Sequence, residues 1–258
     1  MSDKDKERLA EGTLISHLLE LRSRLVRATA AIAVLFIPAA IFRNKIFEAL
    51  AAPLIKQLHL NGGSLIATGV TSTFVAPFKL AFFVAIFAAM PYVLYQLWSF
   101  VAPGLYRKEK RFAVPLLVSA IVLFYVGAAF AYKFVFPMAF HFFAGSGPAD
   151  VLVMTDIDKY LDFALKMFLA FGVAYEVPVI VVLLTLTGLV TVEKLNSVRG
   201  YVIIGIFVVA AILTPPDPLS QCLMAIPMWL LYEGGVLMAR LLTRGKKPAA
   251  DANVENGG

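Results

Sequence analysis

The feature that most restricts the fold of this chain is a series of long apolar runs, separated by short segments rich in Lys, Arg, Gly and Pro. A helix needs about 20 apolar residues to cross a hydrocarbon layer of about 30 Å. The composition agrees with such crossings, because 60% of the residues are hydrophobic and 16% are charged, whereas soluble domains are about 45–50% apolar and about 25% charged. The sequence therefore predicts an all-α integral membrane protein.

Six of these runs are candidate spans. They cover residues 25–43, 76–101, 112–136, 161–189, 199–214 and 219–238. The fifth is short, because an ideal helix from Gly200 to Thr214 is only about 22 Å long. We expect a single six-span membrane domain over residues 1–242 and a disordered cytoplasmic tail over residues 243–258. Prolines within or near the runs predict kinked helices, and they are Pro38, Pro91, Pro115, Pro178 and Pro227.

The distribution of basic residues predicts the orientation in the membrane. With both termini in the cytoplasm, most of the 23 lysines and arginines lie on the cytoplasmic side, as the positive-inside rule requires. The formal net charge of +6 is therefore attributed to membrane orientation and not to binding of nucleic acid. We expect a multi-pass protein of the bacterial plasma (inner) membrane.

Glu176 lies within an apolar run, residues 167–192, that contains no other charged residue with which it could pair. An ionisable side chain at membrane depth is expensive and marks a functional site by default. We group it with Gln96 and Gln221 as an intramembrane polar site that contacts a partner. Two alternatives stay open: a hydrogen-bonded glutamate that only ties two helices together, or the binding carboxylate of a small-cation secondary transporter. Two observations speak against the transporter: the sequence has no second acid in mid-span, and it shows no inverted repeat.

Residues for catalysis or metal binding are not grouped in this sequence. The three histidines fall at different depths of the predicted topology. His17 and Glu20 have a spacing found in some metal sites, but no second such pair exists. Neither a nucleophile motif nor a phosphate-binding glycine loop is present. We expect no enzymatic activity, no metal and no cofactor.

Two acidic residues on the cytoplasmic side are surrounded by bases. Glu20 lies in the segment His17–Leu25, which leads into the first span, and Glu109 lies in the segment Pro103–Arg111, between the second and third spans. Local charge compensation is one interpretation, since Glu20 and Arg24 are four residues apart and such a pair contributes only about 0.3–0.5 kcal/mol. Recognition of a basic ligand is the other.

With the six-span topology, these two segments closely resemble the TatC family, the polytopic subunit of the twin-arginine protein translocase. The resemblance covers residues 14–240 and rests first on His-Leu-x-Glu-Leu-Arg-x-Arg-Leu at 17–25 and Pro-x-Leu-Tyr-x-x-Glu-x-Arg at 103–111. Shorter matches are Ala52-Pro53-Leu54, Tyr95-Gln96-x-Trp98, Ala170-Phe171-Gly172, Glu176-Val177-Pro178 and Leu213-Thr214-Pro215-Pro216-Asp217.

The resemblance implies a receptor for twin-arginine signal peptides and the core of a translocase that exports folded proteins, driven by the protonmotive force. It implies that Glu20 and Glu109 contact the paired arginines. Supporting residues of the same surface would be Arg22, Phe100 and Leu105. Glu176 would lie on the concave, membrane-embedded face of the bundle.

The resemblance also assigns an external turn and a set of partners. Pro53 and Asp217 would lie in external turns. The partners would be TatB-like and TatA-like single-span subunits, signal peptides of folded cargo, membrane lipids and further copies of the chain within the complex. A purely structural scaffold for other membrane subunits remains a further alternative.

Overall fold

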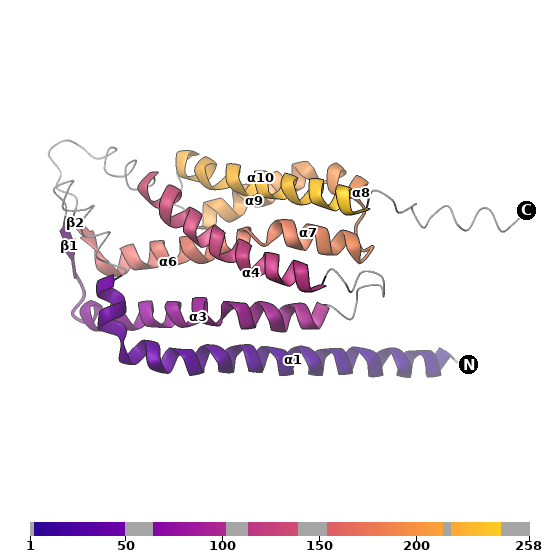
Figure 1. Ribbon diagram of the computed structural model, residues 1–258, viewed down its shortest axis with the longest axis horizontal. Helices are drawn as coiled ribbons and strands as arrows, with labels where there is room; N and C mark the ends of the chain where they lie inside the picture. The colour runs from indigo at the N-terminus through magenta and orange to yellow at the C-terminus, as the bar shows by residue number, and fades with distance from the viewer. Residues whose placement is uncertain (1–2, 50–63, 102–112, 139–153, 214–217, 244–258) are drawn as a thin grey trace, which may run out of the picture.

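The computed structural model describes residues 3–49, 64–101, 113–138, 154–213 and 218–243, which form a bundle of long helices (Figure 1). The helices are α1 (Asp3–Ile41), α3 (Ser72–Val101), α4 (Ala113–Phe130), the π-helical turn η3 (Ala131–Val135), α6 (Ile157–Ala174), α7 (Val177–Leu186), α8 (Val192–Ser197), α9 (Arg199–Leu213) and α10 (Pro218–Thr243). Two three-residue strands, β1 (Ser64–Ile66) and β2 (Met154–Asp156), complete the described part.

The predicted all-α membrane fold is confirmed. Five stretches of helix are long and apolar enough to cross a membrane, namely Ser16–Ile41, Ser72–Phe100, Ala113–Met138, Ile157–Leu186 and Met224–Thr243. The run predicted to be the short fifth span forms a shorter apolar helix, Arg199–Ile212. The tail over residues 243–258 lies outside the described residues apart from Thr243. The bounds of the membrane crossings themselves, and the concave shape, remain predictions.

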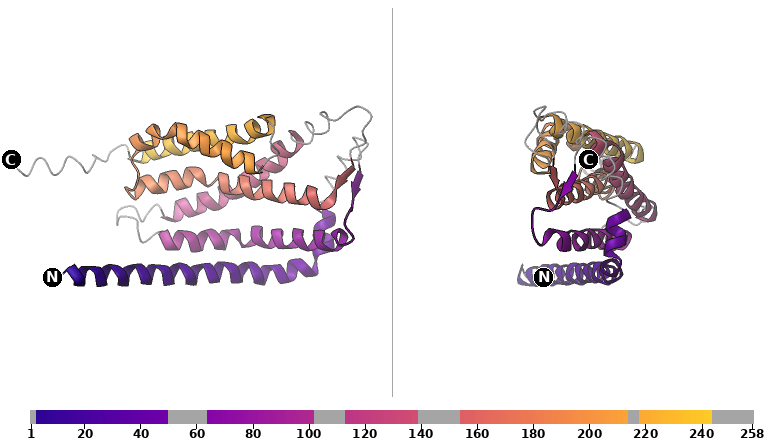
Figure 2. Two further views of the ribbon diagram at one scale, coloured as in Figure 1. Left: turned by 180° about the vertical axis from the view of Figure 1, so that it is seen from behind. Right: turned by 90° about the vertical axis from the view of Figure 1, so that its left-hand side faces the viewer.

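The bundle has two distinct ends (Figures 1 and 2). The start of α1, the end of α3 and the end of α10 lie at one end, which we call the terminus-bearing end. The two strands lie at the other, the strand-bearing end. The start of α1 and the end of α10 therefore lie on the same side, as expected for a chain with an even number of crossings.

Helix α1 runs along one flank of the bundle beside α3 (Figure 1). Near the strand-bearing end, Phe36 meets Phe82 edge-on at 5.7 Å between ring centroids, and the Arg43 guanidinium lies 4.5 Å from the centroid of the Phe78 ring. Ala39 is buried there against α3. Much of the rest of α1 is apolar and exposed, as expected of a helix that borders lipid.

The centre of the bundle is a close crossing of α4 and α6. A Cβ added at Gly172 would lie 2.6 Å from the Phe124 ring, and one added at Gly127 would lie 2.5 Å from the carbonyl oxygen of Phe171. Phe124 and Phe171 are both fully buried. Small residues that allow backbones to approach closely are typical of helix packing in membranes. Lipid tails are as apolar as the helices, so the helices associate through van der Waals packing and not through the hydrophobic effect.

A second close approach joins α7 and α10. A Cβ added at Gly235 would lie 2.8 Å from the Cα of Pro178 and 3.2 Å from the Cβ of Val181. The adjacent Gly234 faces open space, with no heavy atom within 4 Å of an added Cβ. Gly235 therefore sets the distance between α10 and the first turn of α7.

The strands were not foreseen in the sequence, which predicts only loops in this region. β1 and β2 pair in parallel, with Ser64 opposite Met154 and Ile66 opposite Asp156. Three-residue strands are too short to show an alternating pattern that distinguishes them from loops. Their pairing depends on contacts between segments about 90 residues apart, which local sequence does not encode.

Candidate functional site

The predicted recognition residues begin with a stripe on α1 at the terminus-bearing end. Glu20, Arg24 and Ala28 are less exposed than the residues on either side of them. With His17 they follow the i, i+3, i+7, i+11 spacing of one helical face. The His17 ring stacks on the Phe100 ring at the end of α3, with centroids 4.2 Å apart and planes 25° apart. This stripe therefore faces α3.

The Glu20 carboxylate is held by a neighbour on its own helix. Arg24 donates two hydrogen bonds to Oε1 of Glu20, from Nε at 3.0 Å and from Nη2 at 2.6 Å. The Glu20 side chain is 40% exposed and that of Arg24 is 21% exposed. Neither of these donors goes to Oε2. The local ion pair considered from the sequence is thus present, and it leaves one carboxylate oxygen open.

The other predicted recognition residues divide into two groups. Phe100 is half-buried at the end of α3, and Arg22 is exposed on α1, away from the stripe that faces α3. Leu105 and Glu109 lie outside the described residues, as do Pro53 and Asp217. The structure therefore brings Glu20 and Phe100 to the same end of two adjacent helices, immediately before the segment that contains Glu109.

Glu176 lies at a break in a long helix. α6 ends at Ala174 and α7 begins at Val177, and the amide of Glu176 donates to the carbonyl of Val173 at 3.0 Å. Pro178 has no N–H to donate to the carbonyl of Ala174, and its ring presses on that carbonyl. The kink predicted near Pro178 is therefore confirmed as an interruption of the helix at Tyr175 and Glu176.

The Glu176 side chain is enclosed by the bundle. The residue is 9% exposed, and its Oε1 has no hydrogen-bond partner among the described residues. A buried polar atom without a partner loses about 1–3 kcal/mol relative to one that is hydrogen-bonded. That Glu176 contacts a partner at membrane depth stays a prediction.

Gln96 has the same character on a different helix. It lies on α3, is 5% exposed, and its Oε1 also has no partner among the described residues. Its neighbours Leu94 and Trp98 share a buried cluster with Val179 of α7. Gln221 is half-buried on α10. No hydrogen bond joins Gln96, Gln221 and Glu176 in the described part of the chain, so their grouping into one site remains a prediction.

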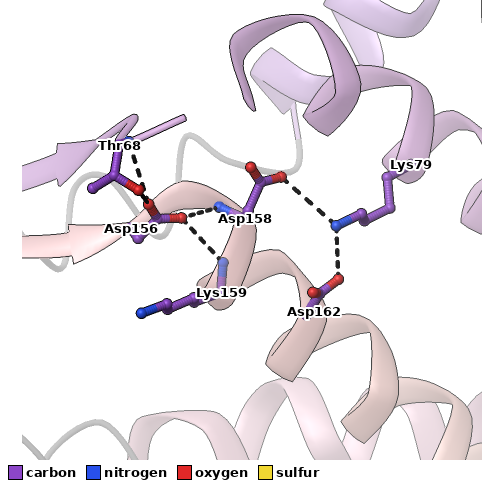
Figure 3. Close-up of polar contacts among 6 residues, drawn as sticks. All are labelled: Thr68, Lys79, Asp156, Asp158, Lys159 and Asp162. Atoms are coloured by element: carbon purple, nitrogen blue, oxygen red, sulfur yellow. Dashed lines mark hydrogen bonds and ion pairs between the residues drawn. The ribbon is translucent and has the colours of Figure 1, made fainter. Parts of the chain in front are cut away.

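A charged cluster at the strand-bearing end was not predicted (Figure 3). Nζ of Lys79 on α3 lies 2.8 Å from Oδ1 of Asp162 and 3.6 Å from Oδ1 of Asp158, both on α6. Lys79 and Asp162 are 83 positions apart in the sequence, so no local sequence pattern predicts this pair. It ties α3 to the first turns of α6.

Asp156 joins the strand pair to the start of α6 (Figure 3). Its Oδ1 accepts from the amides of Asp158 at 2.8 Å and Lys159 at 3.3 Å, as a helix N-cap does. Its Oδ2 accepts from the hydroxyl and the amide of Thr68. The hydrogen bond from Thr68 lowers the pKa of Asp156 below its ordinary value of 3.8. An aspartate before an apolar run is a sequence signal for this cap.

Among the residues that the structure describes, no three His, Cys, Asp or Glu side chains gather as metal ligands would. The arrangement instead offers carboxylates of two kinds. Glu20 is partly exposed on α1, near the end of α3, and Glu176 is buried at a helix break.

Comparison with known proteins decides the family. The family model described as Sec-independent protein translocase protein (TatC) matches residues 16–227. The chain belongs to the TatC family. Similar proteins include Sec-independent protein translocase protein TatC of Azotobacter chroococcum mcd 1, which is 52% identical over 237 residues, 92% of each chain. Another is that of Escherichia coli strain K12, 51% identical over 227 residues, 88% of each chain.

A solved structure agrees with the fold. It is described as a crystal structure of the twin arginine translocase receptor TatC, and it matches with a TM-score of 0.79 at 40% identity, covering 88% of this chain and 100% of that one. Membership in TatC makes this chain a membrane-embedded component of a Sec-independent protein translocase. It is a transport subunit and not an enzyme.

Proposed function

We propose that the chain is the receptor for twin-arginine signal peptides and the core of a protonmotive-force-driven translocase that exports folded proteins across the bacterial plasma membrane. Both termini are then cytoplasmic, and the terminus-bearing end receives the signal peptide. The observation that supports this most directly is the open Oε2 of Glu20, on the face of α1 that stacks on Phe100 at the end of α3.

The chemistry of the ligand fits carboxylates at this end. A guanidinium presents a planar fork of donors that matches carboxylate oxygens, whereas an ammonium is a point charge with no such geometry. Two adjacent arginines need two separately placed acceptors. Glu20 on α1 and Glu109 on the following cytoplasmic segment would supply them, supported by Arg22, Phe100 and Leu105.

The basic residues around Glu109 require an explanation under this proposal. Arg107, Lys108, Lys110 and Arg111 create a positive field that repels a basic signal peptide. Anionic lipid at the cytoplasmic surface attracts such residues, and salt screens their field within about 8 Å. Short-range pairing at Glu109 then decides specificity.

Glu176 and Gln96 would contact a partner helix within the membrane. Each has a buried oxygen with no partner among the described residues, and a hydrogen bond between helices in a membrane contributes about 0.6–2 kcal/mol. A TatB-like or TatA-like span, or the inserted signal peptide, would supply the donor. Pro53 and Asp217 would lie in external turns, and several copies of the chain would share one complex.

Photo-crosslinking tests the recognition site. A crosslinker near residue 20 or 109 is expected to capture a signal peptide with Arg-Arg and to capture the Lys-Lys form poorly. Glu109→Lys is expected to abolish capture, because it replaces an acceptor with a repelling charge, and Glu109→Ala to weaken it. Unchanged capture in both variants would refute the assignment.

A small-cation transporter built on Glu176 gains no support from the described residues. A bound cation needs several oxygen ligands, and in that part of the chain no three His, Cys, Asp or Glu side chains gather at Glu176. Cation-dependent uptake into vesicles, with no export defect on deletion, would be the result that favours it.

A further inference from the structure

Glu20 already has a guanidinium bound to it before any signal peptide arrives. Nε and Nη2 of Arg24 both donate to Oε1, at 3.0 and 2.6 Å. The proposed ligand of Glu20 is also a guanidinium, so Arg24 occupies one of the two oxygens with the same chemistry. Both hydrogen bonds from Arg24 go to Oε1, which leaves Oε2 as the oxygen that Arg24 does not bind.

Arg24 is held on the side of α1 that faces α3. Ala28, one turn further on, is buried, and His17, two turns before Arg24, stacks on Phe100. These two contacts fix the rotation of α1 about its axis. The half-buried stem of Arg24 then has few orientations available, and its pairing with Glu20 is more ordered than that of a fully exposed pair.

We propose that Arg24 is a positioning residue that sets the preference of Glu20 for arginine over lysine, an inference that rests on the proposed signal-peptide binding. Arg24 performs two separable tasks. Its positive charge offsets the charge of Glu20, and its two hydrogen bonds fix the direction of Oε2.

The first task weakens the attraction of Glu20 for any cation. A compact ammonium relies on charge alone, so it loses most from a compensating charge beside the carboxylate. The second task favours a ligand with directional donors. An oxygen fixed in advance loses less conformational entropy when a guanidinium binds, and the planar fork of arginine takes most advantage of that.

The test uses the full chain in lipid nanodiscs and two fluorescent synthetic signal peptides, one with Arg-Arg and one with Lys-Lys. The quantity measured is the dissociation constant of the Lys-Lys peptide divided by that of the Arg-Arg peptide, so a lower ratio means a weaker preference for arginine. Arg24→Gln removes the charge, and we expect Lys-Lys binding to tighten about two- to fivefold while Arg-Arg binding changes less. Arg24→Lys keeps the charge but removes the paired hydrogen bonds from Nε and Nη2 to Oε1 of Glu20. We expect Arg-Arg binding to weaken about two- to fivefold while Lys-Lys binding stays unchanged.

Arg27→Gln is the matched control, because it removes the same charge from an exposed residue of α1 without touching the Glu20–Arg24 pair. Its ratio is expected to equal that of the wild type. The inference is overturned if both Arg24 variants keep the wild-type ratio, or if Arg27→Gln lowers the ratio as much as Arg24→Gln does. A wild-type chain with no preference for Arg-Arg would overturn the proposed function itself.

Thermal unfolding of each variant separates selectivity from misfolding. An ion pair between partly exposed residues four apart contributes little to stability, so all three variants are expected to unfold near the wild-type temperature. If Arg24→Gln unfolds early, Arg24→Met replaces it, because this variant keeps an apolar stem and has the same expected ratio.

Discussion

At the scale of single residues, the chain contains carboxylates placed where they do not favour its own stability. Glu176 is buried with an unpartnered oxygen, although an apolar side chain of similar size would fit a membrane bundle better. Natural proteins keep such groups where function needs them. Stability and export are therefore expected to respond in opposite directions to the same substitution.

Glu176→Met is expected to raise the free energy of unfolding of the isolated chain by about 1–3 kcal/mol, because it removes a buried polar group without a partner. Export of a twin-arginine reporter is expected to fall. Glu176→Gln keeps an acceptor and should export at close to the wild-type rate. Thermal unfolding in detergent and an export assay in cells check both. Loss of export in Glu176→Gln would instead point to a requirement for ionisation.

Asp156 makes the strand pair sensitive to acid. Thr68 hydrogen-bonds the carboxylate and lowers its folded pKa below 3.8, so its stabilising effect is complete above the unfolded pKa and is lost as the pH falls through the folded pKa. We expect β1 and β2 to stay paired from neutral pH to about pH 4 and to loosen below it. Amide hydrogen exchange over residues 64–66 measures this, and Asp156→Asn should remove the pH dependence.

At the scale of helices, the bundle is defined by a few positions where backbones nearly touch. Gly235 packs on the Cα of Pro178, in the first turn of α7 directly after Glu176. Any side chain at Gly235 would push α10 away from this turn. The helix break that carries Glu176 is thus held in place by a glycine on another helix.

Adjacent glycines of α10 are expected to differ sharply. Gly235→Ala should lower the free energy of unfolding by about 1–3 kcal/mol, because its Cβ meets a backbone atom that cannot move cheaply. Gly234→Ala faces open space and should be neutral or stabilise by up to about 1 kcal/mol through helix propensity. Thermal unfolding of the two variants decides this. Equal effects would show that α10 does not pack closely on α7.

The sequence predicts those features of the helices that depend on local pattern. The apolar runs predict where the long helices lie. The run that begins near Gly200 is correctly predicted to form a short helix, and Pro178 is correctly predicted to disturb the helix that contains it. The partners of Lys79 and Gly235 could not be predicted, since they lie on distant segments brought together only by folding. The Glu20–Arg24 pair was visible from its spacing, but the direction of the open oxygen was not.

At the scale of the whole molecule, the two ends of the bundle are expected to face opposite sides of the membrane. Val70 follows β1 and is 98% exposed, and Ser197 is exposed at the end of α8, near the terminus-bearing end. In a Cys222→Ser background, a membrane-impermeant maleimide added to intact cells should label Val70→Cys and leave Ser197→Cys unlabelled until the cells are opened. The reverse pattern would invert the topology.

Helix α1 contacts α3 near the strand-bearing end and again at the level of Glu20, where His17 stacks on Phe100. Near the strand-bearing end it is fixed by Phe36 against Phe82 and by Arg43 over Phe78, while Glu20 lies about 24 Å away along the axis, at about 1.5 Å per residue. A tilt of roughly 5° about the fixed end would carry Glu20 sideways by roughly 2 Å over that length. The stack of His17 on Phe100 opposes such a tilt, so a single ring contact keeps the Glu20 carboxylate within hydrogen-bonding reach of an incoming guanidinium.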